Sequence, residues 1–164
     1  MGIVRCKELL FLHTLSGSDY TSRFYKVGKD KFWDTRISKS SVSETFLMYS
    51  DSPSLPLPDE HLSKVEAFVI SLYDVVDESA SIDFVRYQVF NYRGNFDVTS
   101  LPPTKDALVH HIHKSAYVAG YVCGRAHIPI KTENPPTNWT WIMEDGKLKC
   151  QWVSYDHAAA TQVT

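Results

Sequence analysis

Residues 7–33 read KELLFLHTLSGSDYTSRFYKVGKDKFW, and this segment predicts two helices separated by two glycine corners. Its first half predicts a helix, because apolar residues recur there at helical spacing. These residues are Leu9, Leu10, Phe11, Leu12 and Leu15. Gly17 is expected to end the helix, since glycine readily adopts the positive φ found at helix ends. Gly28 is expected to precede a second, lysine-rich helix that begins near Lys29.

The two glycine corners predict a surface for an anion. Ser18 and Asp19 follow the first corner and have short side chains suited to capping a turn. Glycine just before a helix lets backbone N–H groups come close to a phosphate, and the helix dipole favours the negative charge. Lysines add positive charge at the second corner. We therefore expect both corners to present main-chain donors and lysines to a polyanion.

This segment resembles the helix–two-turn–helix of the flap-endonuclease-like branch of the PIN nucleases. The family pattern is an apolar helix, Leu-Gly-Ser-Asp-Tyr, then Gly-Ile-Gly and basic residues. The matching residues here are Leu15, Gly17, Ser18, Asp19, Tyr20, Val27, Gly28 and Lys31. Lys26 stands where the first glycine of Gly-Ile-Gly is expected, and Asp30 stands where a basic residue is usual.

The resemblance implies that Asp19 helps to hold a catalytic divalent metal, with Mg²⁺ as the cofactor. The alternative is a capping or turn aspartate that needs no metal. Two-metal phosphodiester hydrolysis requires several converging carboxylates, and the nearby sequence offers only Asp30 and Asp34. Catalysis by this chain alone is therefore not expected.

The resemblance also implies that the turn grips the DNA backbone. The predicted nucleic-acid-binding residues are Gly17, Ser18, Arg23, Lys26, Gly28, Lys29 and Lys31. The alternative is a solvated helix start with ordinary surface lysines. The formal net charge is -2, so DNA contact would have to come from a local basic patch.

The composition is that of one globular domain, with 164 residues and a hydrophobic fraction of 43%. Three cysteines without a signal-peptide pattern favour a reducing, intracellular compartment, nuclear or cytoplasmic. No apolar run is long enough to cross a bilayer. Nothing like an acidic α/β catalytic core precedes Cys6, so the resemblance implies a missing N-terminal catalytic domain or another protein partner.

Along the chain we predict five segments, which together form one unit. They are a helix–two-turn–helix-like segment (1–38), a Ser/Pro-rich connection with a short helix (39–58), a helical region (59–138), a β-hairpin (139–153) and a flexible tail (154–164). Helices are expected over 59–73 and 81–92, from the spacing of their apolar residues. The predicted fold is mainly α, a bundle of about five helices with a C-terminal β-hairpin.

A long helix is expected from Thr104, a good N-cap, to about Arg125. Its predicted buried stripe contains Leu108, Ile112, Ala119, Val122 and Cys123. Small residues at Ala116, Gly120 and Gly124 predict close approach of another helix. Histidines 110, 111 and 113, with Cys123 and His127, admit a zinc interpretation, against which surface or packing histidines are the alternative.

Asp145-Gly146 predicts a two-residue hairpin turn. The resulting register pairs Glu144 with Lys147, Met143 with Leu148, Trp141 with Cys150 and Trp139 with Trp152. One face of this hairpin is apolar and is expected to cover the long helix.

The second half has a resemblance of its own, to a little-characterised group of animal proteins that occur in many genomic copies, as mobile-element-derived genes do. The residues that carry it include Phe68-Val69, Arg86-Tyr87 and Leu101-Pro102-Pro103-Thr104. It implies one continuous unit and supplies no activity. A protein-interaction module of a mobile-element-derived protein, with no nucleic-acid role, is therefore the alternative function.

Overall fold

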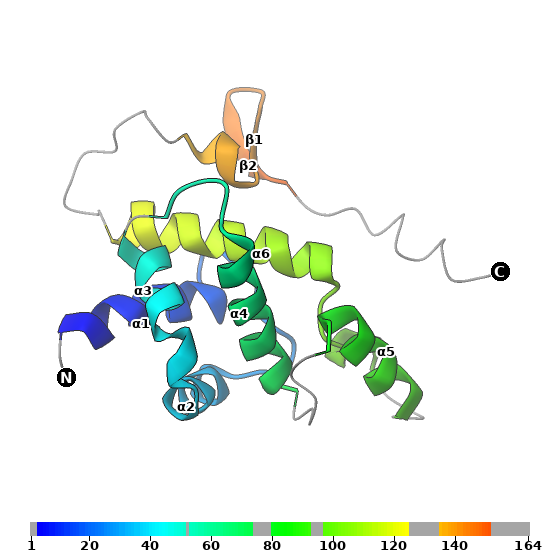
Figure 1. Ribbon diagram of the computed structural model, residues 1–164. Helices are drawn as coiled ribbons and strands as arrows, with labels where there is room; N and C mark the ends of the chain where they lie inside the picture. Colours follow the sequence, from blue (N-terminus) through cyan, green and yellow to red (C-terminus); the bar gives the residue numbers. More distant parts are fainter. Residues whose placement is uncertain (1–2, 52, 74–79, 93–96, 125–134, 152–164) are drawn as a thin grey trace.

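The structure is a computed structural model that describes residues 3–51, 53–73, 80–92, 97–124 and 135–151 (Figure 1). It confirms a mainly α fold with a C-terminal antiparallel hairpin. The α-helices in the described ranges are α1 (Ile3–Leu15), α2 (Lys29–Ser38), α3 (Ser43–Asp51), α4 (Asp59–Ser71), α5 (Ile82–Tyr92) and α6 (Lys105–Tyr117). Short 3-10 turns are η1 (Ser40–Val42), η2 (Val98–Ser100) and η4 (Pro136–Trp139), and a π-helix, η3 (Val118–Cys123), continues α6.

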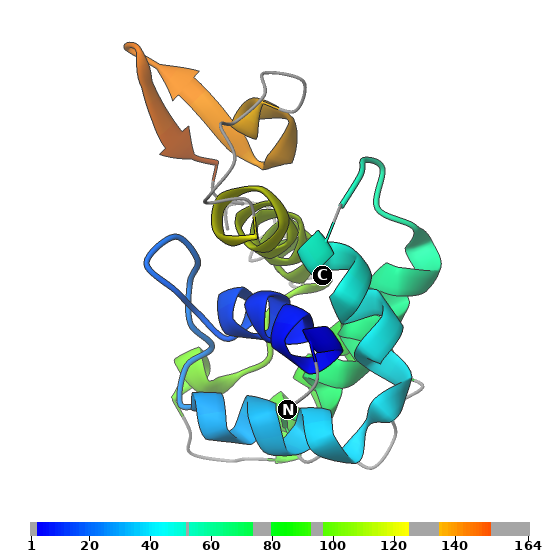
Figure 2. The ribbon, with the colours of Figure 1, turned by 90° about the vertical axis from the view of Figure 1, so that its left-hand side faces the viewer.

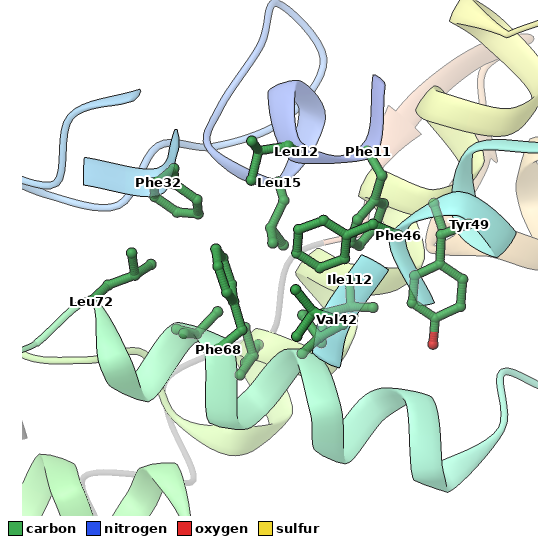
Figure 3. Close-up of a cluster of buried hydrophobic side chains, with 14 of the residues drawn as sticks. Phe11, Leu12, Leu15, Phe32, Val42, Phe46, Tyr49, Phe68, Leu72 and Ile112 are labelled. Atoms are coloured by element: carbon green, nitrogen blue, oxygen red, sulfur yellow. The ribbon is translucent and has the colours of Figure 1, made fainter. Parts of the chain in front are cut away.

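The core forms where α1, α3 and α4 meet, and aromatic rings fill it (Figure 3). The Phe11 ring lies 5.1 Å from that of Phe46 and 5.0 Å from that of Tyr49, both edge-to-face. Phe46 in turn meets Phe68 of α4 edge-to-face at 5.1 Å. Such pairs contribute about 0.5–1.5 kcal/mol each beyond the area they bury. The segment 39–58 thus supplies α3, a central element of the core.

The predicted apolar stripes explain which helix faces are buried. On α1, Phe11 and Leu15 are fully buried, whereas Leu9 and Leu10 are half-buried. On α4 and α5 the buried residues follow the predicted spacing, with exposed aromatic residues on the outer side of α5. Among the described residues, no helix is long and apolar enough to span a membrane.

α6 begins as predicted, because the Thr104 hydroxyl accepts a hydrogen bond from the Ala107 amide at 3.4 Å. The helix also packs closely at Gly120, where an added Cβ would lie 2.3 Å from Cδ of Pro53. The expected burial of Cys123 is wrong, since this residue is exposed. The chain is a π-helix from Val118 to Cys123, with wider turns than an α-helix. Residues that would share the buried face of an α-helix therefore point in other directions, and Cys123 faces solvent.

The hairpin comprises β1 (Trp141–Glu144) and β2 (Lys147–Cys150), and their register is the predicted one. Asp145 (φ 51°) and Gly146 (φ 71°) form the turn, as a two-residue hairpin connection requires. Trp152 lies outside the described residues, and Trp139 belongs to η4. The Trp139 ring is fully buried 5.9 Å from each of the Tyr117 and Tyr121 rings.

The apolar face of the hairpin covers α6 only at its base. Trp141 is half-buried beside Lys114, whose Nζ lies 5.4 Å from the centre of one of its rings. Met143 and Leu148 near the tip are 59% and 45% exposed, so the expectation that this whole face is covered is wrong. The strands project beyond the helix on the side away from α1 and α2, and only the first part of the face therefore reaches it (Figure 2).

Candidate nucleic-acid interface

The first corner, between α1 and the following loop, requires glycine for two reasons. Gly17 has a φ of +110°, a conformation that other residues rarely adopt. An added Cβ would also lie 2.3 Å from Cγ of Arg23, so the stem of that side chain lies directly against the Gly17 backbone. Gly17 therefore ends α1 as predicted and positions Arg23.

The amides of this first corner bond to neighbouring groups of the chain. Ser18 N donates to the Thr21 carbonyl at 3.2 Å and to the Thr21 hydroxyl at 3.0 Å. Thr21 N donates to the Ser18 carbonyl at 3.4 Å, and Gly17 N to the Thr14 carbonyl at 3.3 Å. The expectation that the first corner presents these donors to a ligand is therefore wrong. The amides of this tight turn form hydrogen bonds within the loop, so Gly17 and Ser18 stabilise the loop.

Asp19 is exposed at the tip of this turn. Its electrostatic neighbours are His13 and Lys29, since burial lowers the pKa of each and the Asp19 carboxylate opposes part of that lowering. Asp30 and Asp34 lie on α2. The described residues contain no group of three or more His, Cys, Asp or Glu that could hold a metal ion. A role for Asp19 in binding Mg²⁺ stays a prediction.

The second corner differs because its helix end is open. Gly28 is the N-cap of α2, with an ordinary φ of -77°, and no side chain caps the first turn. A Cβ added at Gly28 would meet nothing within 4 Å. Lys26, two residues earlier, has a φ of 57°, the conformation for which glycine is favoured. The backbone thus takes a left-handed turn at the position where the resembling family has glycine.

Three cationic side chains gather at this second corner. Lys29 donates a hydrogen bond from Nζ to Nδ1 of His13 at 2.8 Å. Partial burial and then the neighbouring Arg23 lower the pKa of Lys29, which shows that the two cations are close. Lys26 is exposed, with Nζ 5.0 Å from the centre of the Tyr25 ring. We call Arg23, Lys26 and Lys29, with Gly28 between them, the basic corner.

Lys31 differs from the residues of the basic corner, because it is half-buried on α2 and already has an interaction partner. Asp30, in the first turn of α2, offsets part of the positive charge there. Of the seven residues predicted to bind nucleic acid, the structure thus brings Arg23, Lys26, Gly28 and Lys29 to one exposed corner.

A groove of about 650 Å³ lies beside the basic corner and was not predicted. Its walls come from the loop before α2, from residues 98–103 and from α6, and Arg86 and Lys114 line it together with Arg23. These residues are far apart in the sequence, and no local motif marks them. We call this the α6 groove.

The histidines of α6 serve packing. His111 donates from Nε2 to the Leu15 carbonyl at 2.8 Å, and its ring meets Phe24 edge-to-face at 5.2 Å. His113 donates from Nδ1 to the Val109 carbonyl at 2.8 Å. Burial is the main cause that lowers the pKa of His110 and His111. His127 lies outside the described residues, and the zinc interpretation gains no ligand set from those that are described.

Comparisons of the chain with models of known families, with curated proteins and with solved structures found no match.

Proposed function

We propose that this chain binds the DNA backbone without reading its sequence, as a non-catalytic part of a flap-endonuclease-like protein of mobile-element origin. The observation that carries the proposal is the basic corner, where Arg23 lies close to Lys29 at the uncapped start of α2 and the exposed Lys26 precedes its N-cap by two residues in the chain. Phosphate contacts of this kind position a protein on DNA and carry no sequence information.

The backbone at Gly28 supports the proposal as well. The first amides of a helix have no partner within the helix, and the dipole favours an anion at this end. A Cβ added at Gly28, just before these amides, would meet nothing within 4 Å. A phosphate oxygen could therefore approach them while lysine side chains contact the neighbouring phosphates.

The charge around the corner limits the expected affinity. Asp19 and Asp30 lie near the same lysines, and the whole chain is slightly acidic. Binding is therefore expected to be weak and strongly reduced by salt. The nuclease activity that the resemblance implies would come from a separate catalytic domain, because the basic corner supplies cations rather than a carboxylate cluster.

A binding titration against salt tests this proposal. Contacts to three phosphates predict a slope of about -3 when log K for a short duplex is plotted against log salt. In Lys26→Gln with Lys29→Gln, the slope should fall to about -1, as each lost contact removes about one unit. Fluorescence anisotropy measures both values.

Lys147→Gln is the matched control, because Lys147 is an exposed lysine on the hairpin, on the far side of α6. Its slope should equal that of the unaltered protein. The proposal fails if the double variant keeps the full slope or if the unaltered chain shows no salt-dependent binding. Mg²⁺-dependent cleavage that Asp19→Ala abolishes would instead support an active nuclease.

The alternative is a protein-interaction module without a nucleic-acid role, and α5 favours it. Phe84 and Tyr87 on the outer face of this helix are 48% and 58% exposed. Exposed aromatic residues of this kind are enriched at protein interfaces. The alternative predicts that Lys26 and Lys29 can be neutralised without loss of binding to any partner.

A further inference from the structure

We propose that the α6 groove binds a small aromatic anion, specifically a nucleoside monophosphate. This site lies next to the basic corner, and the inference does not depend on DNA binding. The groove has a volume of about 650 Å³, within the range of about 300–1,000 Å³ that is usual for small-molecule sites.

The first argument is charge. Cationic side chains reach the groove from three separate elements, with Arg23 on the loop before α2, Arg86 on α5 and Lys114 on α6. No Asp or Glu is among the described residues that line it. Asp97 and Asp106 lie near its edge, since Asp97 precedes the lining residue Val98, and Asp106 opposes part of the lowering of pKa that burial causes at His110. The interior of the groove therefore favours an anion over a cation.

The second argument is that two of these cations are held in place. The stem of Arg23 lies against Gly17, with its Cγ 2.3 Å from where a Cβ would stand. Arg86 donates from Nη1 to the Pro102 carbonyl, which fixes the guanidinium on the groove wall. A guanidinium has five N–H donors, so this bond leaves others for a phosphate, which it can contact in bidentate fashion.

The third argument is the shape and chemistry of the walls. Aromatic residues line the groove together with Val98, Leu101 and two prolines. The rings are those of Phe24, Tyr25 and Tyr73. Tyr25 is 46% exposed, so its ring is accessible to a ligand in the groove. Flat apolar walls suit the faces of a nucleobase, which stack on aromatic side chains whatever the base.

Because the groove combines cations with apolar and aromatic walls, a nucleotide is expected to bind more tightly than a nucleoside or phosphate alone. The base would pack on the aromatic and apolar residues of the groove, and its phosphate would face Arg23 and Arg86. The hydroxyl of Thr99 and the amide of Gln151 line the same groove and offer polar contacts to the base or ribose. An extended acidic peptide would leave the flat walls less well covered.

The experiment is isothermal titration calorimetry of the full chain with AMP, adenosine and inorganic phosphate at low salt. AMP is expected to bind about tenfold more tightly than adenosine or phosphate, because charge-assisted contacts and stacking act together. Val98→Glu places a carboxylate in the groove at a position that is 61% exposed, and folding should tolerate it. It is expected to weaken AMP binding about tenfold, whereas the uncharged control Val98→Gln should retain most of it.

Two further measurements separate this site from the basic corner. Lys29→Gln should weaken DNA binding and leave AMP binding unchanged, because Lys29 does not line the groove. Val98→Glu should weaken AMP binding far more than DNA binding. The inference is overturned if AMP binds no more tightly than phosphate or adenosine, or if Val98→Glu and Val98→Gln bind AMP equally. It is also overturned if an acidic peptide binds and AMP does not.

Discussion

Gly17 and Gly28 stand at the two corners between α1 and α2, but only Gly17 needs to be glycine for the fold. Gly17 has a φ of +110° and no room for a Cβ, whereas Gly28 has a φ of -77° and open space around it. The amides at the first corner bond within the loop, and no side chain caps the helix at the second. The first corner thus builds the loop, and the second has an uncapped helix start, which is where we propose that a phosphate binds.

This comparison shows that glycine can stand at two neighbouring helix boundaries for different physical reasons. At Gly17 the cause is backbone conformation and contact with Arg23. At Gly28 neither the conformation nor the space inside the protein demands glycine. The proposed phosphate contact would give the missing side chain at Gly28 a role.

The largest expected effect comes from adding a methyl group at each corner. Gly17→Ala should lower the free energy of unfolding by about 2–3 kcal/mol, through the strained φ and the overlap with Arg23. Gly28→Ala should change it by less than about 1 kcal/mol. Urea unfolding of both variants measures the difference. Equal losses of stability in the two variants would contradict the claim that only Gly17 is needed for the fold.

A smaller effect is expected from pH, because the first corner is tied to α6 through His111. Its bond to the Leu15 carbonyl and its neutral form belong to the folded state, where burial lowers the pKa below the usual 6.5. The unfolded chain therefore binds more protons below pH 6.5, and stability should fall as the pH drops through that value. Urea midpoints at neutral and mildly acidic pH measure this loss.

His111→Gln is the control for that pH effect. Its side-chain amide can still donate to the Leu15 carbonyl but does not titrate. The dependence of stability on pH should become shallower in this variant. An unchanged slope would show that other groups cause the loss, such as His13 or His110, whose pKa values are also lowered.

At the second corner, a lower pH is expected to change the affinity for DNA, and this is the smallest of the expected effects. Nδ1 of His13 can accept the hydrogen bond from Lys29 only while the ring is unprotonated there. Burial, followed by the charge of Lys29, lowers the pKa of His13, so protonation begins below its usual range. Protonation of His13 would release Lys29 from this hydrogen bond and would make His13 itself a cation. The affinity for DNA should therefore rise about twofold. His13→Ala, titrated at the same two pH values, should lose this rise.

Much of the fold follows from local patterns that the sequence displays. The apolar spacing of α1, α4 and α5, the Thr104 cap and the Asp145-Gly146 turn each depend on neighbours within a few residues. The exposure of Cys123 could not be predicted in this way, because the apolar spacing assumed an α-helix where the chain forms a π-helix.

The parts of the candidate site that depend on residues close together in the sequence could be predicted, and the others could not. Gly17 and Gly28 were placed correctly at the two helix boundaries by their positions in the sequence. That the Ser18 amide is used by Thr21 depends on the exact path of the loop, which no spacing rule gives. The α6 groove lies beyond any such rule, since Arg23, Arg86 and Lys114 meet only through the tertiary fold.

Substitution of Gly28 by aspartate and by asparagine tests the open corner most directly. Both side chains can cap α2 and should stabilise it by a few tenths of a kcal/mol, but only aspartate repels phosphate. Measured by fluorescence anisotropy at low salt, Gly28→Asp is expected to bind a DNA duplex about tenfold more weakly than Gly28→Asn. Equal DNA affinities for the two variants would contradict the claim that the start of α2 receives a phosphate.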